Sequence, residues 1–398
     1  MASESTARWD LILVGGGLQN GLIALATLAA RPDAKVLLIE KADALGGNHT
    51  WSFHLESIPP EARAWFEPLI EHRWPRYAVK FPDLSRTLEH AYATCSSERF
   101  AAIVATRMGG APNAELRLGV EVVEVGPSGV RTGGGEVIEG RLVVDARGPR
   151  ERATSDSGYQ KFVGLEVELE APIDDQVALL MDATVPQRDA IAGQPSAGAF
   201  RFVYVLPFSP TRALVEDTYF ANDATLDIAG VRARVMAYLG DRGMRVVRVL
   251  REEHGVLPMP WRAAGPVSRK NPLVAGYRGG WFHPATGYSV PVALRLACFI
   301  AARAPEDVFG AEFDRLADGH EKEARFGHLL NELLFTATEP AQRWKVFRHF
   351  YELPDDVTLR FYGMELTAAD KRKMFLRRPP PGVNFLKAMR ILPSWGLR

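Results

Sequence analysis

Cysteine and an excess of charge are what this sequence most plainly lacks. Cys95 and Cys298 are its two cysteines, they lie far apart, and no CxxC pair exists. A secreted disulfide scaffold and a zinc module of paired cysteines are therefore not expected, and a reducing cytosol fits. The 48 Lys and Arg residues equal the 48 Asp and Glu residues. No net charge draws the chain to nucleic acid and no nucleic-acid motif is present, so we expect no such partner.

Long hydrophobic runs are also missing. No apolar stretch approaches the roughly 18 residues that a membrane-spanning helix needs. The segment from Met1 to Asp10 is polar and carries two acidic residues against one arginine, so it lacks the basic start of a signal peptide. We therefore expect any contact with a membrane to be peripheral.

Hydrophobic residues, by contrast, are plentiful. They make up 47% of the 398 residues, which is enough for a large core, and the length predicts two or three lobes. The middle of the chain has the pattern of strands, and the part from Val290 onward has the pattern of helices. The expected strands include 77–81, 118–125, 142–144, 162–169, 200–206 and 213–220, and the expected helices include 290–302, 311–335 and 341–352.

The amino-terminal end carries a strand, glycine turn, helix and second strand in succession. A strand over 9–14 leads into Gly15, Gly16 and Gly17, and a helix of small residues precedes a strand over 36–39. The first glycine permits a tight turn, and the second lets the backbone approach a pyrophosphate. The helix start then offers free N–H groups and the positive end of its dipole. The pattern predicts a phosphate-binding turn.

Three residues around this unit modify the prediction. Asn20 stands where the strict fingerprint has its third glycine, and Gly21 comes one residue late, which weakens the glycine pattern taken alone. Glu40, with Lys41 beside it, ends the second strand, where a carboxylate would accept hydrogen bonds from a ribose. Strand, glycines, helix, strand and terminal acid together predict a dinucleotide-binding β-α-β unit.

Later segments favour FAD as the dinucleotide. A Gly-Gly stretch follows Glu40 within a few residues, as in many FAD proteins. The strand over 142–145 resembles the late strand of flavin monooxygenase-like proteins that returns to the nucleotide, and 276–287 resembles their flavin-contacting loop. Arg99, near a helix start, fits a pyrophosphate ligand or a solvated side chain equally well. The cofactor contacts expected from these segments are Gly46, Gly47, Asn48, Arg99, Asp145, Gly276, Pro284, Thr286, Gly287 and Tyr288.

These patterns predict an α/β fold. We expect a Rossmann-type FAD-binding domain with a β-sheet substrate domain and a helical carboxyl-terminal region. The expected limits are 1–75, 95–155 and 268–305 for a discontinuous FAD-binding domain, 76–94 and 156–267 for the substrate-binding domain, and 306–398 for the helical region, with a membrane as a candidate surface for the last.

Five segments together resemble the bacterial lycopene β-cyclase family of carotenoid biosynthesis, over a span from about Asp10 to Phe361. They are DLILVGGGL at 10–18, GGNHTWSF at 46–53, RFVYVLP at 201–207, LVEDT at 214–218 and FHPATGYS at 282–289. The resemblance implies a flavoprotein that isomerises lycopene through γ-carotene to β-carotene with no net redox change. It further implies reduced FAD as the active form, NADPH as the reductant, and a cytoplasmic protein held peripherally at the inner face of the bacterial membrane.

Cyclising the end of a polyene needs an acid, an apolar cavity, cation stabilisation and a base. Glu216 and Asp217 are the carboxylic acids we expect to be catalytic. On an alternating strand only one of them can point into a given cavity. The family match assigns proton donation to Glu216, with Asp217 orienting it or acting nearby. Burial would raise the pKa of Glu216 and keep it protonated; two solvated acids on an exposed strand edge are the alternative.

Aromatic residues in the motifs are candidates for holding the carbocation. We expect Trp51, Phe53 and Tyr204 at the substrate, together with His283, which fits a structural hydrogen bonder near the flavin better than a base. An anionic reduced flavin would also stabilise the cation, and whether flavin or acid delivers the proton stays open. His320 is followed by Glu321 but by no second histidine at zinc-protease spacing, so we expect no metal site.

The tail is basic and aromatic. Residues 367–398 contain eight Lys or Arg residues against a single acid, Asp370, interleaved with Met, Phe, Leu, Ile and Trp. Such a composition suits an anionic membrane interface, from which lycopene could enter the cavity without crossing water. A helix packed on the body with a solvated basic face is the alternative, and the two can coexist.

Two other functions fit the same fold. A redox flavoprotein that hydroxylates or reduces an isoprenoid would change the mass of its product, whereas cyclisation would not. Flavin hydroxylases usually carry Gly-Asp at the start of the late loop, where this chain has Gly276-Tyr277, which counts against that activity. A carotenoid-binding protein with a vestigial nucleotide site would bind pigment without turnover. The oligomeric state is left open.

Overall fold

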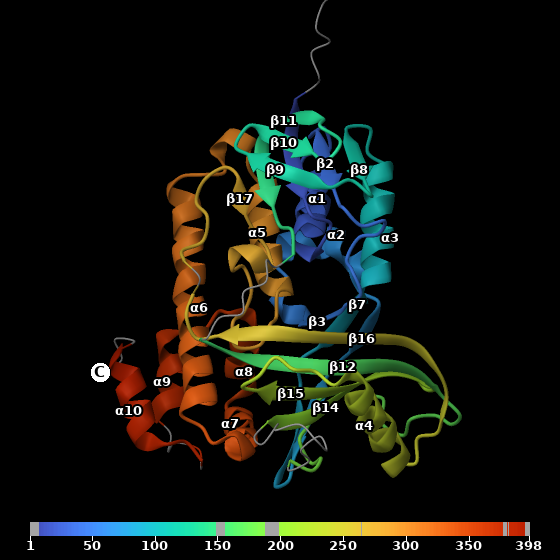
Figure 1. The fold of residues 1–398 in the computed structure, drawn as a ribbon, viewed down its shortest axis with the longest axis vertical. Helices are drawn as coiled ribbons and strands as arrows, with labels where there is room; N and C mark the ends of the chain where they lie inside the picture. Colours follow the sequence, from blue (N-terminus) through green and yellow to red (C-terminus); the bar gives the residue numbers. More distant parts are fainter. Residues whose placement is uncertain are drawn as a thin grey trace, which may run out of the picture.

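The protein is described by a computed structural model that covers residues 8–148, 156–187, 199–263, 265–376, 380 and 382–394. Figure 1 shows an elongated molecule with one large sheet at each end of its long axis and a smaller sheet between them. Helix α6 (Ala311–Thr336) runs along one side from the first end to the second. The described chain therefore has an α/β architecture in which the middle of the molecule joins two sheets.

The amino-terminal sheet has the strand order β8-β2-β1-β11-β10-β9, with β17 beside β11. The pairings of β1 with β2 and with β11 are parallel, whereas β9, β10 and β11 form an antiparallel meander. The strands are β1 (Trp9–Val14), β2 (Val36–Ile39), β8 (Ala114–Arg117), β9 (Val122–Gly126), β10 (Gly129–Thr132), β11 (Val137–Asp145) and β17 (Leu273–Val274).

This sheet is apolar on both faces because both faces are covered. Leu11 and Leu13 of β1 pack in the core formed with the helices, and Ile12 and Val14 pack against the β9–β11 meander. The covering helices are α1 (Leu18–Ala30), α3 (Ser97–Gly109) and α5 (Val290–Ala301). The predicted β-α-β unit of β1, α1 and β2 is thus present in the structure.

One predicted strand of this region was wrong. The segment 118–125 was expected to be continuous, but β8 ends at Arg117 and β9 begins at Val122. Gly119 between them has a φ of 69°, a left-handed conformation that turns the chain. The glycine run at 133–135 is not followed by a helix pattern, so its sequence predicts a hairpin turn rather than a phosphate loop. It lies in the turn between β10 and β11, where Gly135 has a φ of 87°.

The second large sheet has the order β16-β12-β15-β14-β13-β5-β6. Its pairings are antiparallel except for β13 with β5. Helix α4 (Ile228–Asp241) covers one face, and the opposite face, rich in aromatic residues, turns toward the rest of the molecule. The strands are β5 (Tyr77–Phe81), β6 (Leu84–Leu88), β12 (Ser157–Leu169), β13 (Ala178–Asp182), β14 (Phe200–Ser209), β15 (Arg212–Ala221) and β16 (Val246–Pro260).

A three-stranded sheet of order β3-β7-β4 lies between the two large sheets (Figure 1). Its strands are β3 (Thr50–His54), β4 (His72–Trp74) and β7 (Tyr92–Ser96). Short helical segments in this region and elsewhere are α2 (Arg63–Phe66) and the 3-10 turns Leu55–Ser57, Pro60–Ala62, Glu67–Leu69, Tyr277–Gly279, Pro305–Asp307 and Pro340–Gln342.

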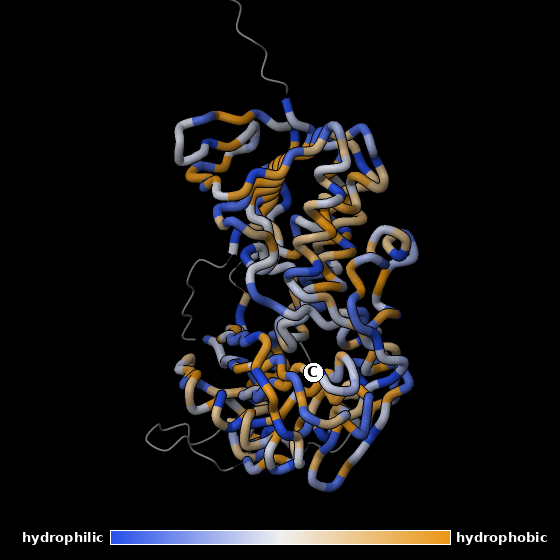
Figure 2. Tube along the Cα trace, turned by 90° about the vertical axis from the view of Figure 1, so that its right-hand side faces the viewer, coloured by the Kyte–Doolittle hydropathy of each residue, from blue (hydrophilic) through white to orange (hydrophobic). Residues whose placement is uncertain are grey.

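The carboxyl-terminal region is helical, as expected. After α6 come α7 (Arg343–Phe350), α8 (Asp355–Gly363), α9 (Ala368–Leu376) and α10 (Phe385–Ser394). Arg343 is fully buried and donates to the carbonyl oxygens of Leu334 and Phe220, which anchors this region on the second sheet. Figure 2 shows hydrophobic segments gathered in both ends of the molecule. None of the helices in the described ranges is long and apolar enough to cross a membrane.

Candidate active site

The glycine turn after β1 ends in an open helix start. Gly15 has a φ of 99°, and a Cβ there would stand 2.9 Å from the backbone of Arg147; a Cβ on Gly16 would stand 2.3 Å from the Leu45 side chain. Beside Gly17, by contrast, nothing lies within 4 Å of the Cβ position, and no side chain caps α1. An uncapped helix start with free space before it suits an anion such as a pyrophosphate.

Asn20 explains the departure from the strict glycine fingerprint. Its Nδ2 donates to the carbonyl oxygens of Val14, at 2.9 Å, and Gly15, at 2.8 Å, so the amide fixes the end of β1. The close helix packing that the third glycine usually permits occurs at Gly21, where a Cβ would stand 2.1 Å from Cζ of Phe100. Asn20 therefore fixes the end of β1, and its neighbour Gly21 permits the close packing of α1.

Glu40 lies at the end of β2, directly over the glycine turn. Its carboxylate accepts hydrogen bonds from the backbone N–H groups of Gly16 and Ala42. The side chain is half-buried, and the neighbouring Lys41 is exposed. A carboxylate held in this position keeps lone pairs available for the hydroxyl groups of a ribose.

The Gly-Gly stretch passes over the same turn. Gly46 and Gly47 have φ values of 80° and 68°, and the N–H of Gly46 donates to the carbonyl oxygen of Gly16 at 3.0 Å. Asn48 leaves this loop for the second sheet, because its Nδ2 donates to the carbonyl oxygen of Glu252 at 3.0 Å. Arg99 is exposed, and its Nε donates to the carbonyl oxygen of Pro68 at 2.8 Å.

Asp145 ends β11 beside the glycine turn. It is 4% exposed, its carboxylate accepts from Arg147 at 2.8 Å, and Arg278 lies 3.5 Å away. Burial alone would raise the pKa of Asp145, but the hydrogen bonds and charge of Arg147 and the charge of Arg278 hold that pKa below its ordinary value. The backbone N–H of Ala275 donates to the carbonyl oxygen of Asp145, which brings the late loop to the same place.

The late loop leads into a second uncapped helix start. Gly276 and Gly287 have φ values of 60° and 73°, and the Oγ1 of Thr286 accepts from the N–H of Tyr288 at 3.2 Å. Helix α5 then begins without a side-chain cap. The carbonyl oxygen of Pro284 accepts from Asn331 of α6. Two open helix starts and glycines in left-handed conformations form a cradle that fits FAD.

The two candidate acids of β15 point in opposite directions. Asp217 is fully buried, accepts from Arg201 at 2.8 Å and from Tyr219 at 2.8 Å, and faces helix α4. Glu216 points to the aromatic face of the sheet, where Tyr204 of β14 is its direct cross-strand neighbour. The expectation that Asp217 shares the site is therefore corrected, because the strand alternation places its carboxylate in an ion pair on the far face.

Glu216 has the properties of an acid rather than of a carboxylate. Burial, first, and the nearby charge of Glu253 raise the pKa of Glu216 to about 8. The Glu216 side chain is half-buried, so part of its surface stays accessible. Thr218 donates to Oε1 at 2.6 Å, which leaves Oε2 as the oxygen that carries the proton.

Hydroxyl groups from four segments converge beside Glu216. The OH of Tyr204 lies within hydrogen-bond distance of Oγ of Ser52, at 2.8 Å, and of the OH of Tyr92, at 3.1 Å, and Tyr92 is hydrogen-bonded to Tyr288 of the late loop. Burial raises the pKa of Tyr92, Tyr204 and Tyr288 well above its ordinary value, so all three are neutral donors. The cluster joins β3, β7 and β14 to the loop that precedes α5.

His54 extends this cluster and was missed by the sequence analysis. Its ring is 1% exposed and lies among the rings of Tyr77, Tyr92 and Tyr362, with centroid distances of 5.1–5.2 Å. Its Nε2 has no hydrogen-bond partner, and burial lowers the pKa of His54 to about 3. The sequence of β3 did contain a signal for this position, because Ser52 and His54 alternate with Trp51 and Phe53 and so share the opposite face of the strand.

The same alternation corrects two predicted substrate contacts. Trp51 and Phe53 point away from the second sheet into the amino-terminal core, where Phe53 is fully buried against Phe66 and Trp51 packs on Phe100. His283 is also occupied: its Nε2 pairs with the carbonyl oxygen of Phe361 at 3.0 Å, and its Nδ1 accepts from the N–H of Ala285 at 3.1 Å. Both ring nitrogens are thus engaged in hydrogen bonds that hold the loop in place, which is a structural role.

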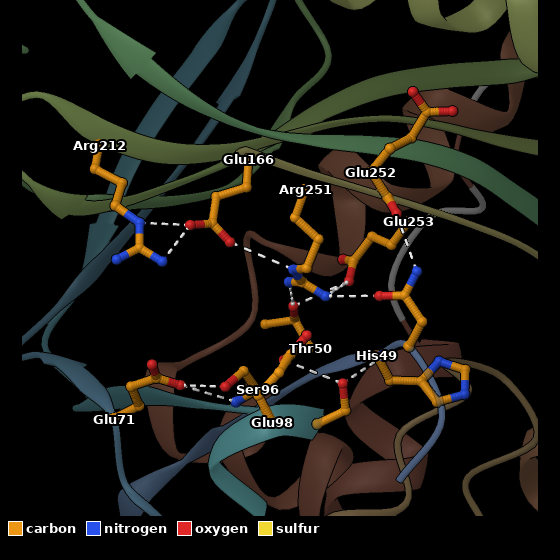
Figure 3. Close-up of polar contacts among 12 residues, drawn as sticks. His49, Thr50, Glu71, Ser96, Glu98, Glu166, Arg212, Arg251, Glu252 and Glu253 are labelled. Carbon is orange, nitrogen blue, oxygen red and sulfur yellow. Dashed lines mark hydrogen bonds and ion pairs between the residues drawn. The ribbon is translucent and has the colours of Figure 1, made fainter. Parts of the chain in front are cut away.

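A polar pocket of about 270 Å³ opens between the small sheet and the aromatic face of the second sheet. Arg251 lies at its centre, with Nε 3.3 Å from Glu166 and a further hydrogen bond to Thr50 (Figure 3). Its lining residues are Thr50, Glu71, His72, Thr94, Ser96, Glu98, Glu166, Phe208, Arg212, Leu250 and Arg251. Charges of both signs meet here, so the pocket is polar but not strongly charged.

His320 makes contacts of a structural kind. Its Nε2 pairs with the carbonyl oxygen of Gly280 at 2.7 Å, and its ring stacks on Trp281 with centroids 4.8 Å apart. Across the residues that the structure describes, His, Cys, Asp and Glu side chains form no group that could hold a metal ion.

Helix α10 has an exposed apolar surface. Phe385, Leu386 and Met389 are 61%, 73% and 49% exposed, whereas Ala388 and Ile391 pack into the helical core. One side of α10 thus packs on the body of the protein, and the other side is exposed. Leu376 has no described side chain, and Arg377, Arg378, Trp395 and Arg398 lie outside the described residues.

Comparison with known sequences finds relatives over nearly the whole chain. Residues 10–388 match the model of the family described as lycopene cyclase protein. The lycopene β-cyclase of Pantoea ananas is 39% identical over 94% of this chain and 95% of its own. That of Paracoccus sp. is 36% identical over 97% of each chain.

Comparison with solved structures finds the same architecture in a reductase-like protein and a monooxygenase. A geranylgeranyl bacteriochlorophyll reductase-like protein of Thermoplasma acidophilum is similar with a TM-score of 0.59 and 12% identity, over 98% of this chain and 99% of that chain. The p-nitrophenol 4-monooxygenase of Pseudomonas putida is similar with a TM-score of 0.56 and 15% identity, over 92% and 96%. At these identities the likeness establishes the fold alone.

Proposed function

The chain belongs to the family of lycopene cyclase proteins, and from this premise we propose that it is a lycopene β-cyclase, which converts lycopene through γ-carotene to β-carotene. The reaction is an isomerisation: each ring gains one proton and loses one, with no net redox change. Monooxygenases and reductases share this fold, so the fold does not identify the reaction. The residues of the site must do so.

The observation that carries the proposal is the state of Glu216. A hydrocarbon can be protonated only by an acid that is still protonated at the working pH, and the pKa of Glu216, raised to about 8, meets that need. The Glu216 side chain also lies on the aromatic face of the second sheet, and burial is the largest cause of its raised pKa. Such a site strengthens the electrostatics of a developing cation.

Residues of the site take part in the successive steps of one ring closure. Oε2 of Glu216 donates its proton to the terminal double bond of lycopene, which leaves a tertiary carbocation; a neighbouring double bond attacks this cation and closes the ring. The hydroxyl groups of Tyr204, Tyr92 and Tyr288 meet beside the acid, and aromatic rings of this kind can stabilise a nearby positive charge. The carboxylate that Glu216 has become then takes one proton from the new ring cation, which forms the ring double bond and restores Glu216 to its acid form.

FAD is the cofactor we propose for the cradle of the two helix starts. Gly15, Gly16, Gly17 and Glu40 would hold its adenosine diphosphate half, and Gly46 with Gly287 would lie along the isoalloxazine. Reduced FAD would supply negative charge near the carbocation, with NADPH as the reductant. The roles of the protein residues in proton transfer do not depend on this.

We also propose a peripheral contact with the membrane through α10. Phe385, Leu386 and Met389 are bare, and Lys387 and Arg390 lie on the same helix. An interfacial helix of this kind gains from apolar burial and from anionic headgroups together. Lycopene could then pass from lipid to the protein without crossing water.

Expression in lycopene-accumulating bacteria tests the function. The chain should convert lycopene to γ-carotene and β-carotene, identified by chromatography and absorption spectra, with product mass equal to that of lycopene. Glu216→Gln should reduce conversion by at least about a hundredfold, in line with loss of a general acid. The matched control is Glu170→Gln, which alters an exposed glutamate of the same fold.

The product mass separates the proposal from its alternatives. A hydroxylase or reductase would add oxygen or hydrogen, and a binding protein would extract lycopene unchanged in stoichiometric amounts. Cyclisation by Glu216→Gln at the wild-type rate would remove Glu216 as the proton donor.

A further inference from the structure

A second glutamate, Glu253, lies on the same face of the second sheet as Glu216 and in cross-strand register with it. In the second sheet Tyr204 of β14 pairs with Glu216 of β15, Glu216 pairs with Gly164 of β12, and Gly164 pairs with Glu253 of β16. Residues in direct cross-strand register point to the same face, so both carboxyl groups lie on the aromatic side. Two strand spacings separate them, or about 10 Å between backbones.

Gly164 contributes no side chain to the space between the two acids. A Cβ on Gly164 would stand 3.1 Å from Cγ of Glu253 and 3.3 Å from Cδ1 of Leu214. A larger residue at position 164 would therefore displace the Glu253 side chain from its position beside Gly164. With a glycine there, no side chain of β12 separates or screens the two carboxyl groups, so they interact across protein of low dielectric.

The environment of Glu253 differs from that of Glu216. Glu253 is 4% exposed, and its Oε2 accepts from Arg251 at 2.8 Å and from Oγ1 of Thr50 at 3.0 Å (Figure 3). The pKa of Glu253 is raised, because burial outweighs the opposing charge of Arg251 and the two hydrogen bonds. In the part of the chain that the structure describes, no cation pairs with Glu216, and its side-chain hydrogen bond comes from the hydroxyl of Thr218. A pair of acids in unequal surroundings is pushed toward one neutral and one ionised member.

The other charged and titratable groups near the pair belong to the elements packed against it. They are Glu166 on β12, Glu98 on α3, His49 before β3, Tyr204 on β14 and Asp217 on the far face of β15. Glu166 and Glu98 act on Arg251 rather than on Glu216, and burial with the charge of Arg251 lowers the pKa of His49. Glu253 is thus the ionisable group of another strand that acts most directly on Glu216.

We propose that Glu253 is a positioning residue for the proton of Glu216: as a carboxylate held by Arg251 and Thr50, it keeps the carboxyl group across Gly164 protonated while the enzyme works. The inference rests on the proposed function for its catalytic meaning. It assigns Glu253 no contact with lycopene. It also gives Thr50, in the strand that follows the Gly-Gly loop, a part in holding the charge.

A pH profile tests the inference. The initial rate of lycopene cyclisation should fall on the alkaline side with a midpoint set by Glu216. Glu253→Gln removes the like charge and should lower that midpoint by about one unit. At pH 9 the variant should then be about tenfold slower than wild type, with rates within about twofold at pH 6.

Glu252→Gln is the matched control. Glu252 is the adjacent residue of β16 but points to the opposite face, where it pairs with Arg232 at 3.0 Å. Its midpoint should equal that of wild type. A Glu253→Gln profile that superimposes on the wild-type profile would overturn the inference while leaving the cyclase activity in place. A loss that is equal at every pH would also overturn it, because that is the mark of a merely structural residue.

A second measurement needs neither turnover nor a folded Glu253→Gln protein. In chain labelled with ¹³C at the glutamate carboxyl, the Glu216 resonance, assigned by Glu216→Gln, should titrate on the alkaline side of neutrality. The Glu253 resonance, assigned by the conservative Glu253→Asp, should stay that of a carboxylate over the same range. A neutral Glu253 there would refute the inference. This titration without any cyclisation of lycopene would instead refute the proposed function.

Discussion

At the scale of single residues, one strand places two adjacent acids in opposite chemical states. Glu216 lacks a cation and faces aromatic rings, whereas Asp217 is bound by Arg201 on the other face. The same change from acid to amide should therefore have opposite consequences at the two positions. The difference arises from the two-residue period of the strand.

Glu216→Gln should make the apoprotein more stable above pH 5. Because the folded-state pKa is raised to about 8 from an ordinary 4.5, the folded protein holds a proton that the unfolded chain releases between these values. The wild type therefore loses stability as pH rises from about 4.5 to about 8, and the variant does not. The free energy of unfolding of the variant should exceed that of the wild type by about 3 kcal/mol at pH 7. Urea unfolding at pH 5, 6, 7 and 8 measures it, and parallel curves for the two proteins would contradict the assignment.

Asp217→Asn should instead destabilise the fold. The substitution removes the carboxylate that accepts from Arg201, a guanidinium that is 7% exposed. Loss of one member of a buried pair typically costs about 3–5 kcal/mol. The same urea titrations at pH 7 should show the loss. An unchanged midpoint would mean that Arg201 is satisfied without Asp217.

At the scale of elements, the start of helix α1 separates binding from packing. Gly17 borders open space and Gly21 lies against Phe100, although both are glycines of one turn and helix. A methyl group added at each position should therefore affect different properties of the protein.

Gly17→Ala should weaken FAD binding without destabilising the apoprotein. Its φ of −78° suits alanine, and no atom lies within 4 Å of the new Cβ, but the methyl group would occupy the approach of a pyrophosphate. We expect the Kd for FAD, measured by flavin fluorescence, to rise at least about tenfold, or about 1.4 kcal/mol. Retention of wild-type affinity would argue against this turn as the phosphate site.

Gly21→Ala should act on stability. The new Cβ would stand 2.1 Å from Cζ of Phe100, so α1 and α3 must separate or the ring must move. Overpacking of this kind costs about 1–3 kcal/mol. Thermal melting should show the loss, and Phe100→Leu in the same chain should recover part of it. Absence of recovery would locate the strain elsewhere.

Helix α10 should bind anionic membranes through its bare side. Replacing Phe385 and Leu386 by serine removes two side chains that are 61% and 73% exposed. Affinity for vesicles of anionic lipid should fall by at least about tenfold, since each buried side chain contributes about 1.5–3 kcal/mol. Co-sedimentation measures this. Glu170→Gln serves as the control, and equal binding by the doubly substituted chain would remove α10 as the contact.

At the scale of the whole molecule, the candidate site exists only where the small sheet, the second large sheet and the loop before α5 meet. Ser52 comes from the small sheet, Tyr204 and Glu216 from the second large sheet, and Tyr288 from the loop before α5. Asn48 and Thr50 bind residues of β16, which ties the Gly-Gly loop to the second sheet. The sheets should therefore behave as one cooperative unit.

FAD should raise the melting temperature of the whole protein in one transition. Because the cofactor binds only the folded state, a concentration of 100 times Kd should add about 2.7 kcal/mol. Far-ultraviolet and tyrosine signals should shift together, although the tyrosine cluster lies beyond the glycine turn. Two separate transitions, with only one sensitive to FAD, would show that the sheets unfold independently.

The sequence by itself determined the elements whose signals are local. The β-α-β unit of β1, α1 and β2, the hairpin at Gly135 and the opposite directions of Glu216 and Asp217 follow from glycine conformations and strand periods, which neighbouring residues set. The family resemblance, from motifs such as that at 282–289, is confirmed by relatives over nearly the whole chain. The cofactor and substrate roles of individual residues stay predictions.

Only the tertiary structure decided which face of each strand meets the site. Trp51 and Phe53 were expected at the substrate, yet it is Ser52 and His54 of the same strand that face the tyrosine cluster beside Glu216. A strand's alternation fixes its two faces but not which of them turns toward the site. Glu253 carries no motif, and its cross-strand register with Glu216 depends on the pairing of β12 with both β15 and β16. Register between distant strands is a long-range property, so no local pattern records it.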